Sequence, residues 1–127
     1  MKKYQLINDT KKIRRITLYR IQALKNFGNI KKGDVGGYVQ LENNLSHNDT
    51  CWIYDNASVF GGANVFGDAS VFGDAQVFGN ADVYEDARVY DNAKVYGDAR
   101  VYGDAEVSGN ARVFGDTQVY GNMKITG

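Results

Sequence analysis

The chain holds one histidine and one cysteine, the residue types most often used for acid–base and nucleophilic chemistry. His47 is the candidate catalytic base, but a general base needs a neighbour that orients its ring and a cleft for the substrate. The surrounding sequence identifies neither, so a hydrogen-bonded structural histidine is the favoured interpretation. Cys51 stands where alanine stands in the repeats described below, and we expect a small buried thiol there. The sequence therefore favours a protein without enzymatic activity.

Basic side chains are concentrated near the N-terminus. Residues 1–34 carry ten Lys or Arg and two Asp, a balance of 10 − 2 = +8, so the remainder carries 5 − 13 = −8. A basic cluster is the usual footprint of a nucleic-acid binder, but no base-reading motif accompanies it and the acidic remainder would repel phosphate. One alternative is docking of the basic segment on the acidic part of a neighbouring copy. The other is an anionic small molecule, whose candidate ligands are Arg14, Arg15, Arg20 and Lys25.

Three acidic side chains, Asp68, Asp86 and Asp104, recur at intervals of eighteen residues. In stacked coils they would lie about 4.8 Å apart and repel one another unless they were solvated or bridged by a cation. A divalent ion is one interpretation and a solvated edge is the favoured one. We expect no cofactor.

A six-residue unit that repeats from Cys51 to the end must position these side chains, as in Ala75-Gln-Val-Phe-Gly-Asn and Ala93-Lys-Val-Tyr-Gly-Asp. Alternation along a strand places the Ala and the Val on one face, and Gly-Asp or Gly-Asn supplies the positive φ of a sharp corner. Two-residue corners are too short for a crossover helix, so the chain must coil. Three units per turn predict an all-β fold, a left-handed parallel β-helix over residues 39–127. Its thirteen units from Cys51 make a little over four turns, after an irregular first coil.

The N-terminal segment is expected to form a separate, basic cap over residues 1–38. Residues 3–7 and 16–24 alternate as strands, and the polar residues 8–12 between them predict the turn of a β-hairpin. A terminal coil exposes unpaired backbone and a bare core, so a cap over the N-terminal end is physically required. A helix over residues 16–27 is the alternative.

The unit Val101-Tyr-Gly-Asp-Ala-Glu resembles the hexapeptide pattern of left-handed β-helix proteins, whose best-known members are acyl- and nucleotidyltransferases. Residues 17–24, 33–39 and 42–54 resemble a group of small hexapeptide-repeat proteins of bacteria and their phages, often labelled transferase-like or polymer-forming. The resemblance implies the fold, and it implies an acyltransferase-like enzyme only as an alternative function. In those acyltransferases the base is typically a histidine at a subunit interface beside a loop that interrupts the coils. Here the repeats have no insertion.

The aromatic residues of the repeat fall in outward positions and stack every third unit. Rings stacked over their corners would cover the backbone, yet the rows still leave apolar ridges, which usually mark an interface. The last unit adds two apolar side chains at the edge of the final coil. The candidate interface residues are Phe66, Tyr84, Tyr102, Tyr120, Met123 and Ile125.

Together these features predict a non-enzymatic, self-associating β-helical protein that acts by binding or as a scaffold. We expect a homo-oligomer, and a dimer and a trimer fit equally well, although trimers are common in the resembling family. A phage origin, with a host factor or host-made ligand as target, is one form of this expectation. No apolar run reaches the length of a membrane span and no signal-peptide stretch follows the start, so a soluble cytoplasmic protein without a membrane partner is expected.

Overall fold

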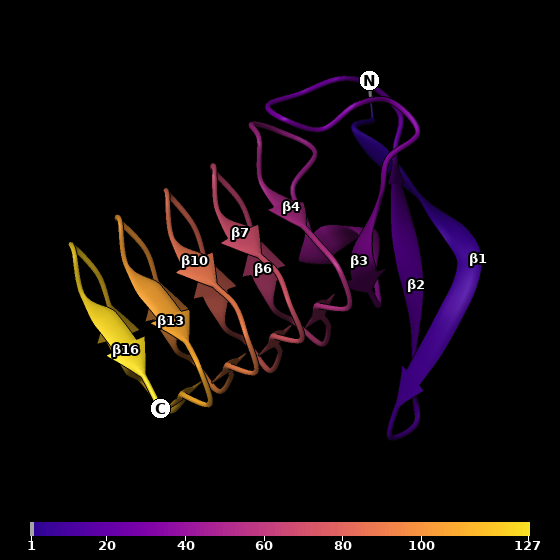
Figure 1. The fold of residues 1–127 in the computed structure, drawn as a ribbon. Coiled ribbons are helices and arrows are strands. Elements are labelled where there is room, and N and C mark those ends of the chain that lie inside the picture. Colours follow the sequence, from indigo (N-terminus) through magenta and orange to yellow (C-terminus); the bar gives the residue numbers. More distant parts are fainter. Residues whose placement is uncertain (1) are drawn as a thin grey trace.

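A computed structural model describes residues 2–127 as a hairpin at one end of a stack of parallel coils (Figure 1). The hairpin strands are β1 (Tyr4–Ile13) and β2 (Ile16–Ala23), and the coils begin with β3 (Val35–Val39) and a short 3₁₀ turn, η1 (Glu42–Asn44). No α-helix occurs in residues 2–127, and none of their segments is a helix that could cross a membrane. Thirteen short strands follow: β4 (Trp52–Ile53), β5 (Ser58–Val59), β6 (Asn64–Val65), β7 (Ser70–Val71), β8 (Gln76–Val77), β9 (Asp82–Val83), β10 (Arg88–Val89), β11 (Lys94–Val95), β12 (Arg100–Val101), β13 (Glu106–Ser108), β14 (Arg112–Val113), β15 (Gln118–Val119) and β16 (Lys124–Thr126).

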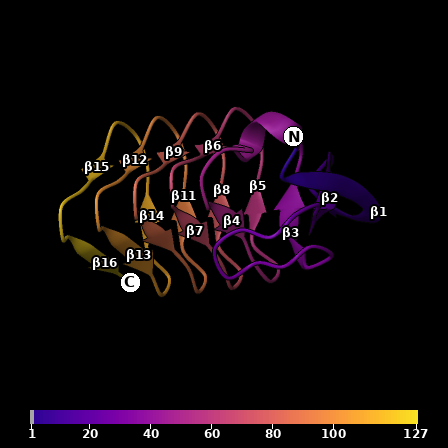
Figure 2. The same cartoon turned by 90° about the horizontal axis from the view of Figure 1, so that it is seen from above.

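The coils stack in parallel with three strands per turn, which confirms the predicted parallel β-helix. Arg88 pairs with Glu106 and Val89 with Val107, so each residue lies beside the one eighteen positions later. The strands form three faces: face A (β3, β5, β8, β11, β14), face B (β6, β9, β12, β15) and face C (β4, β7, β10, β13, β16). Faces A and C each hold five strands, one for each of about five turns (Figure 2). The irregular first coil is also confirmed. In the segment between β3 and β4, Leu45 makes an isolated parallel bridge to Val65 instead of belonging to a strand.

The core is a column of alanine and valine side chains inside the prism. From Ala57 to Val107 every alanine and valine of the repeat is fully buried, as alternation along short strands predicts. Cys51 continues the alanine column and is also fully buried, which confirms the expected position of the thiol. Each coil therefore depends on its neighbours for burial, so no single repeat would fold alone.

The N-terminal segment forms the predicted hairpin but turns at a different place. β1 and β2 pair antiparallel from Tyr4↔Ala23 to Ile13↔Ile16, so the alternative helix over residues 16–27 is wrong. The turn predicted at residues 8–12 is also wrong, because those residues lie in β1 and the chain turns at residues 14–15. Polar residues are tolerated in β1 because it is an edge strand, and a register shift between Leu6 and Thr10 absorbs the irregularity. The longer hairpin consequently carries its tip to the corner that follows face A.

Candidate ligand groove

Two basic residues of the N-terminal segment, Arg20 and Lys11, fasten the hairpin to the first coils. The Arg20 guanidinium donates to the Asp9 carboxylate at 2.9 Å, to the Gly36 carbonyl at 2.8 Å and to the Tyr38 hydroxyl at 2.6 Å. Lys11 Nζ donates to the Asn56 carbonyl at 2.8 Å. Both cations lie 4.3 Å from the centroid of the Tyr38 ring. Burial lowers the pKa of Lys11, and the Arg20 charge lowers it further. These contacts hold the hairpin in one position against face A.

A groove of about 380 Å³ lies between the hairpin tip and the corner that follows face A. Its apolar wall comes from Ile13 and Ile16 of the hairpin and Phe78 of the coils, which pack against buried Leu18 and Phe60. Residues 2–127 contribute two cations and no carboxylate to the lining. The lining residues are Ile13, Arg14, Ile16, Phe60, Gly61, Gln76, Phe78, Gly79 and Lys94.

Arg14 reaches the groove from a backbone conformation that favours glycine. Its φ is 57°, in the left-handed region, where an ordinary side chain costs roughly 1–2 kcal/mol. Such strain persists where the side chain is needed or the surrounding structure imposes it. Arg15, the other residue of the turn, is exposed and does not line the groove. The tip thus offers a matched pair of arginines, only one of which lines the groove.

The structure brings only one of the four predicted ligand residues to this groove. Arg20 is committed to Asp9 and Tyr38, and Lys25 lies half-buried just beyond β2. The second groove cation is Lys94, which sequence reasoning missed. A sequence signal for Lys94 did exist. On face A, the outward residue of successive coils is never acidic: these residues are Ser58, Gln76, Lys94 and Arg112.

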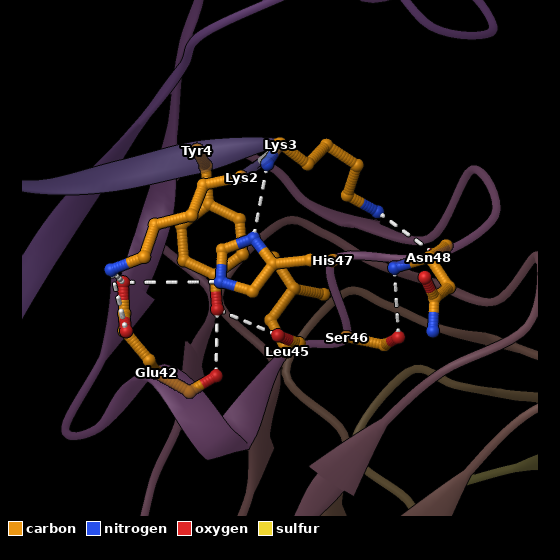
Figure 3. A network of polar contacts seen from close by, with 8 residues as sticks. All are labelled: Lys2, Lys3, Tyr4, Glu42, Leu45, Ser46, His47 and Asn48. Atoms are coloured by element: carbon orange, nitrogen blue, oxygen red, sulfur yellow. Dashed lines mark hydrogen bonds and ion pairs between the residues drawn. The ribbon is translucent and has the colours of Figure 1, made fainter.

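His47 lies instead in a polar network at the N-terminal end of the coils (Figure 3). Its Nδ1 accepts the backbone N–H of Lys3 at 3.1 Å, and its ring stacks on Tyr4 with centroids 4.2 Å apart. Its Nε2 lies 3.8 Å from Glu42 Oε1. Burial lowers the pKa of His47, while the Glu42 carboxylate opposes the shift. The ring is therefore a neutral acceptor that fastens β1 to the first coil, and it does not line the groove.

Lys3 is a second residue of this network that sequence reasoning missed. The whole residue is buried, and Nζ donates to the carbonyls of Cys51 at 2.8 Å and of Asn48 and Asp49 at 3.3 Å. Nζ also lies 3.4 Å from Cys51 Sγ and 4.8 Å from the centroid of the Phe27 ring. Burial lowers the pKa of Lys3 and raises that of the Cys51 thiol. A lysine that directly follows another lysine near the N-terminus carries no sequence signal of burial.

The predicted interface row on face B stacks ring on ring. The centroid distances are 4.8 Å for Phe66–Tyr84, 5.0 Å for Tyr84–Tyr102 and 5.6 Å for Tyr102–Tyr120. Phe66 and Tyr120 remain exposed at the two ends of the row. In the last coil Met123 is exposed and Ile125 is half-buried. Whether these residues form an interface stays a prediction.

The three periodic aspartates do not form a metal site in the described part of the chain. Asp68 Oδ1 accepts the Thr50 hydroxyl at 2.8 Å and its N–H at 3.2 Å. Across residues 2–127 no three His, Cys, Asp or Glu side chains, Asp86 and Asp104 included, come close enough to hold a metal ion. Of the three, Asp68 instead binds the backbone N–H and the hydroxyl of Thr50 in the preceding coil.

The comparisons with known proteins concern the coils. A family model described as the YdcK beta solenoid repeat matches residues 87–103, 93–107 and 105–121. These segments span 121 − 87 + 1 = 35 of the 127 residues and run from β10 to β15. No curated protein matches the chain. The similarity is thus to a β-solenoid repeat. It does not extend to the hairpin, and of the residues that line the groove it includes Lys94.

Proposed function

We propose that this chain is a binding protein that takes a small organic anion into the groove between the hairpin tip and face A. One observation carries the proposal: Arg14 and Lys94 enter the same groove from different elements, beside apolar side chains and without a carboxylate from residues 2–127. An anion with an apolar body satisfies both the charge and the lining. A volume of about 380 Å³ lies within the ordinary range of small-molecule sites.

The groove walls favour affinity because they are held in place before a ligand arrives. One wall belongs to the stacked coils, and the other is fixed through Arg20 and Lys11. Little conformational entropy is then lost on binding. The guanidinium of Arg14 can donate two parallel hydrogen bonds to a carboxylate, sulfonate or phosphate, while the apolar lining can contact the body of the ligand.

The lining chemistry favours binding over catalysis. In the described part of the chain, the groove contains no histidine, cysteine, serine or carboxylate that could act as nucleophile or general base. The acyltransferase-like alternative would use His47 as its base. However, Nδ1 of His47 already accepts the backbone N–H of Lys3, and its ring stacks on Tyr4. A host-made metabolite as the ligand belongs to the same binding proposal.

Nucleic acid is a less suitable occupant of face A. The rings of Phe60, Phe78, Tyr96 and Phe114 stack with centroids 5.0, 4.9 and 5.4 Å apart. Neighbouring rings therefore cover both faces of Phe78 and Tyr96, and Phe114 at the end of the row, which is 55% exposed, stacks on one neighbour only. The row thus offers a base one ring face rather than a series of stacking platforms. A single nucleotide is compatible with the proposal only if it binds in the groove as a small organic anion.

The test uses two dyes with the same aromatic body. Anilinonaphthalene sulfonate carries a negative charge and phenylnaphthylamine does not, so fluorescence titration at fixed salt isolates the contribution of charge. The sulfonate dye is expected to bind the native protein. Arg14→Gln should weaken its binding roughly tenfold or more, as loss of a charge-assisted hydrogen bond predicts, and leave the neutral dye unaffected. Arg15→Gln changes the net charge identically and should have little effect. Equal losses in the two variants would exclude the groove as the anion site.

A second proposed function is self-association through the face B row. It is supported by the exposed ends of that row, where 38% of Phe66 and 47% of Tyr120 are accessible. Phe66→Ser combined with Tyr120→Ser should lower the mass measured by sedimentation. Val35→Ser is the matched control, because Val35 is 50% exposed but lies outside the row. A native protein that is already monomeric would refute this second function.

A further inference from the structure

The rings that border the groove present only their rims to a ligand. Phe78 stacks between Phe60 and Tyr96, with planes 3° and 5° apart, so both of its faces are covered by neighbouring rings. Phe60 is itself buried against Leu18 and Tyr38. The rim of an aromatic ring is its electropositive part, and it attracts either an anion or the face of another aromatic ring.

The opposite wall of the groove is aliphatic. Ile13 and Ile16, the residues that flank the turn, provide branched side chains. Gly61 and Gly79 of the coil corners also line the groove, and neither carries a side chain that would obstruct a flat ligand. The space between these walls suits a planar body that presents one face to the ring rims and the other to the isoleucines. A flexible aliphatic chain would gain the contact with the isoleucines but not the contact between an aromatic face and the ring rims.

We propose that the ligand of this groove is an aromatic carboxylic acid, with its ring system between the rims of Phe60 and Phe78 and the side chains of Ile13 and Ile16, and its carboxylate at Arg14 and Lys94. This assignment rests on the proposed function and narrows it to one chemical class. It distinguishes aryl acids from fatty acids of the same charge and from neutral aromatic compounds of the same shape.

Gln76 adds a specificity element to this site. It is the only neutral polar side chain that residues 2–127 contribute to the lining, and its amide can both donate and accept a hydrogen bond. A ligand body with one hydroxyl or ring nitrogen near Gln76 would satisfy that amide. A ligand without such a group would offer the Gln76 amide no hydrogen bond. The amide would then bind water or remain without a partner, and the affinity would be lower.

The test compares three probes by calorimetry at one salt concentration: naphthoate, hydroxynaphthoate and decanoate. Naphthoate should bind about three- to tenfold more tightly than decanoate, the advantage expected from ring-rim contacts. Phe78→Leu removes the aromatic ring but keeps an apolar side chain, and it should abolish that preference. Phe72→Leu is the matched control, since Phe72 stacks on Tyr90 at 4.7 Å on face C, away from the groove. Across the isomers of hydroxynaphthoate, at least one should bind more tightly than naphthoate, and Gln76→Leu should remove that gain.

The outcomes separate this assignment from the proposed function beneath it. If decanoate binds as tightly as naphthoate and both require Arg14, the groove binds anions but the aromatic class is wrong. If Phe72→Leu reduces the preference as much as Phe78→Leu, the rings act through general stability and the assignment is also overturned. If the binding of neither probe depends on Arg14, the proposed function itself fails.

Discussion

Arg14 combines a strained backbone with a position in the groove, and a single substitution can separate the two. Glycine adopts a φ of 57° without steric cost, so Arg14→Gly should leave the free energy of unfolding unchanged or raise it by up to about 1 kcal/mol. The same variant should lose affinity for naphthoate. Urea denaturation and calorimetry on one preparation measure both effects. A variant that unfolds more easily, or that binds as the native protein does, would show that Arg14 serves the turn rather than a ligand.

His47 predicts a pH dependence of stability. Burial lowers the pKa of His47 below the ordinary histidine value of about 6.5, so at pH values just below 6.5 the unfolded chain binds more protons than the folded one. The stabilising contribution of the neutral ring is fully present above about pH 6.5 and is lost as the pH falls through the folded pKa. The physical reason is that a protonated ring cannot accept the Lys3 N–H.

The measurement is the urea midpoint at about pH 7.5 and about pH 5.5, which bracket the ordinary pKa of histidine. The native protein should be less stable at the lower pH. His47→Asn keeps an acceptor near the position of Nδ1 but does not titrate in this range, so its midpoint should change less. An equal loss of stability in both proteins would assign the effect to other groups.

At the scale of the single element, the corners limit which residues the solenoid accepts. Gly97 and Gly115 share the left-handed conformation, with φ values of 69° and 66°. A Cβ on Gly97 would lie 2.8 Å from the backbone nitrogen of Gly115, whereas a Cβ on Gly115 would meet no atom within 4 Å. Gly97→Ala should therefore cost about 1–3 kcal/mol more than Gly115→Ala, the range for forced overpacking. Equal urea midpoints for the two variants would mean that the coils separate freely to admit a side chain.

The other corners show how a larger residue can be accommodated. Asp91 occupies the same kind of corner with a φ of 60°, and its carboxylate accepts the Gly109 N–H at 3.0 Å. Asp55 repeats this contact with the Gly73 N–H at 3.1 Å. Aspartate thus recovers part of the steric cost through a hydrogen bond to the next coil, which alanine cannot do.

The elements differ in how far the sequence could predict them. The coils could be predicted because each unit places the same two small apolar residues inward, and a period of eighteen leaves one way to stack them. The hairpin turn could not, because a polar stretch looks alike in a turn and in an exposed edge strand. The groove depends on contacts between residues 13–16 of the hairpin tip and residues 60–94 of the coils, which lie far apart in the sequence. No local pattern therefore linked Arg14 to Lys94.

At the scale of the whole molecule, a stack of regular coils carries one irregular attachment, the hairpin, and the proposed ligand site lies where the two meet. Lys3 and His47 fasten the start of β1, and Lys11 and Arg20 fasten its far half, so the hairpin is held at both ends. The three faces of the coils are built from the same units, yet only the corner after face A receives the hairpin tip. A ligand should consequently affect one edge of the prism and leave the other two unchanged.

The restriction of ligand effects to one edge of the prism can be measured directly. Glycines occupy corners on all three edges, and their backbone amides each give a signal in a nitrogen–proton correlation spectrum. On titration with naphthoate, the amides of Gly61 and Gly79 should shift in proportion to occupancy, while Gly67 and Gly73 on the other two edges stay in place. Arg14→Gly should abolish the shifts and Arg15→Ala should preserve them. Shifts spread over all three edges, or confined to Gly67 or Gly73, would contradict the account.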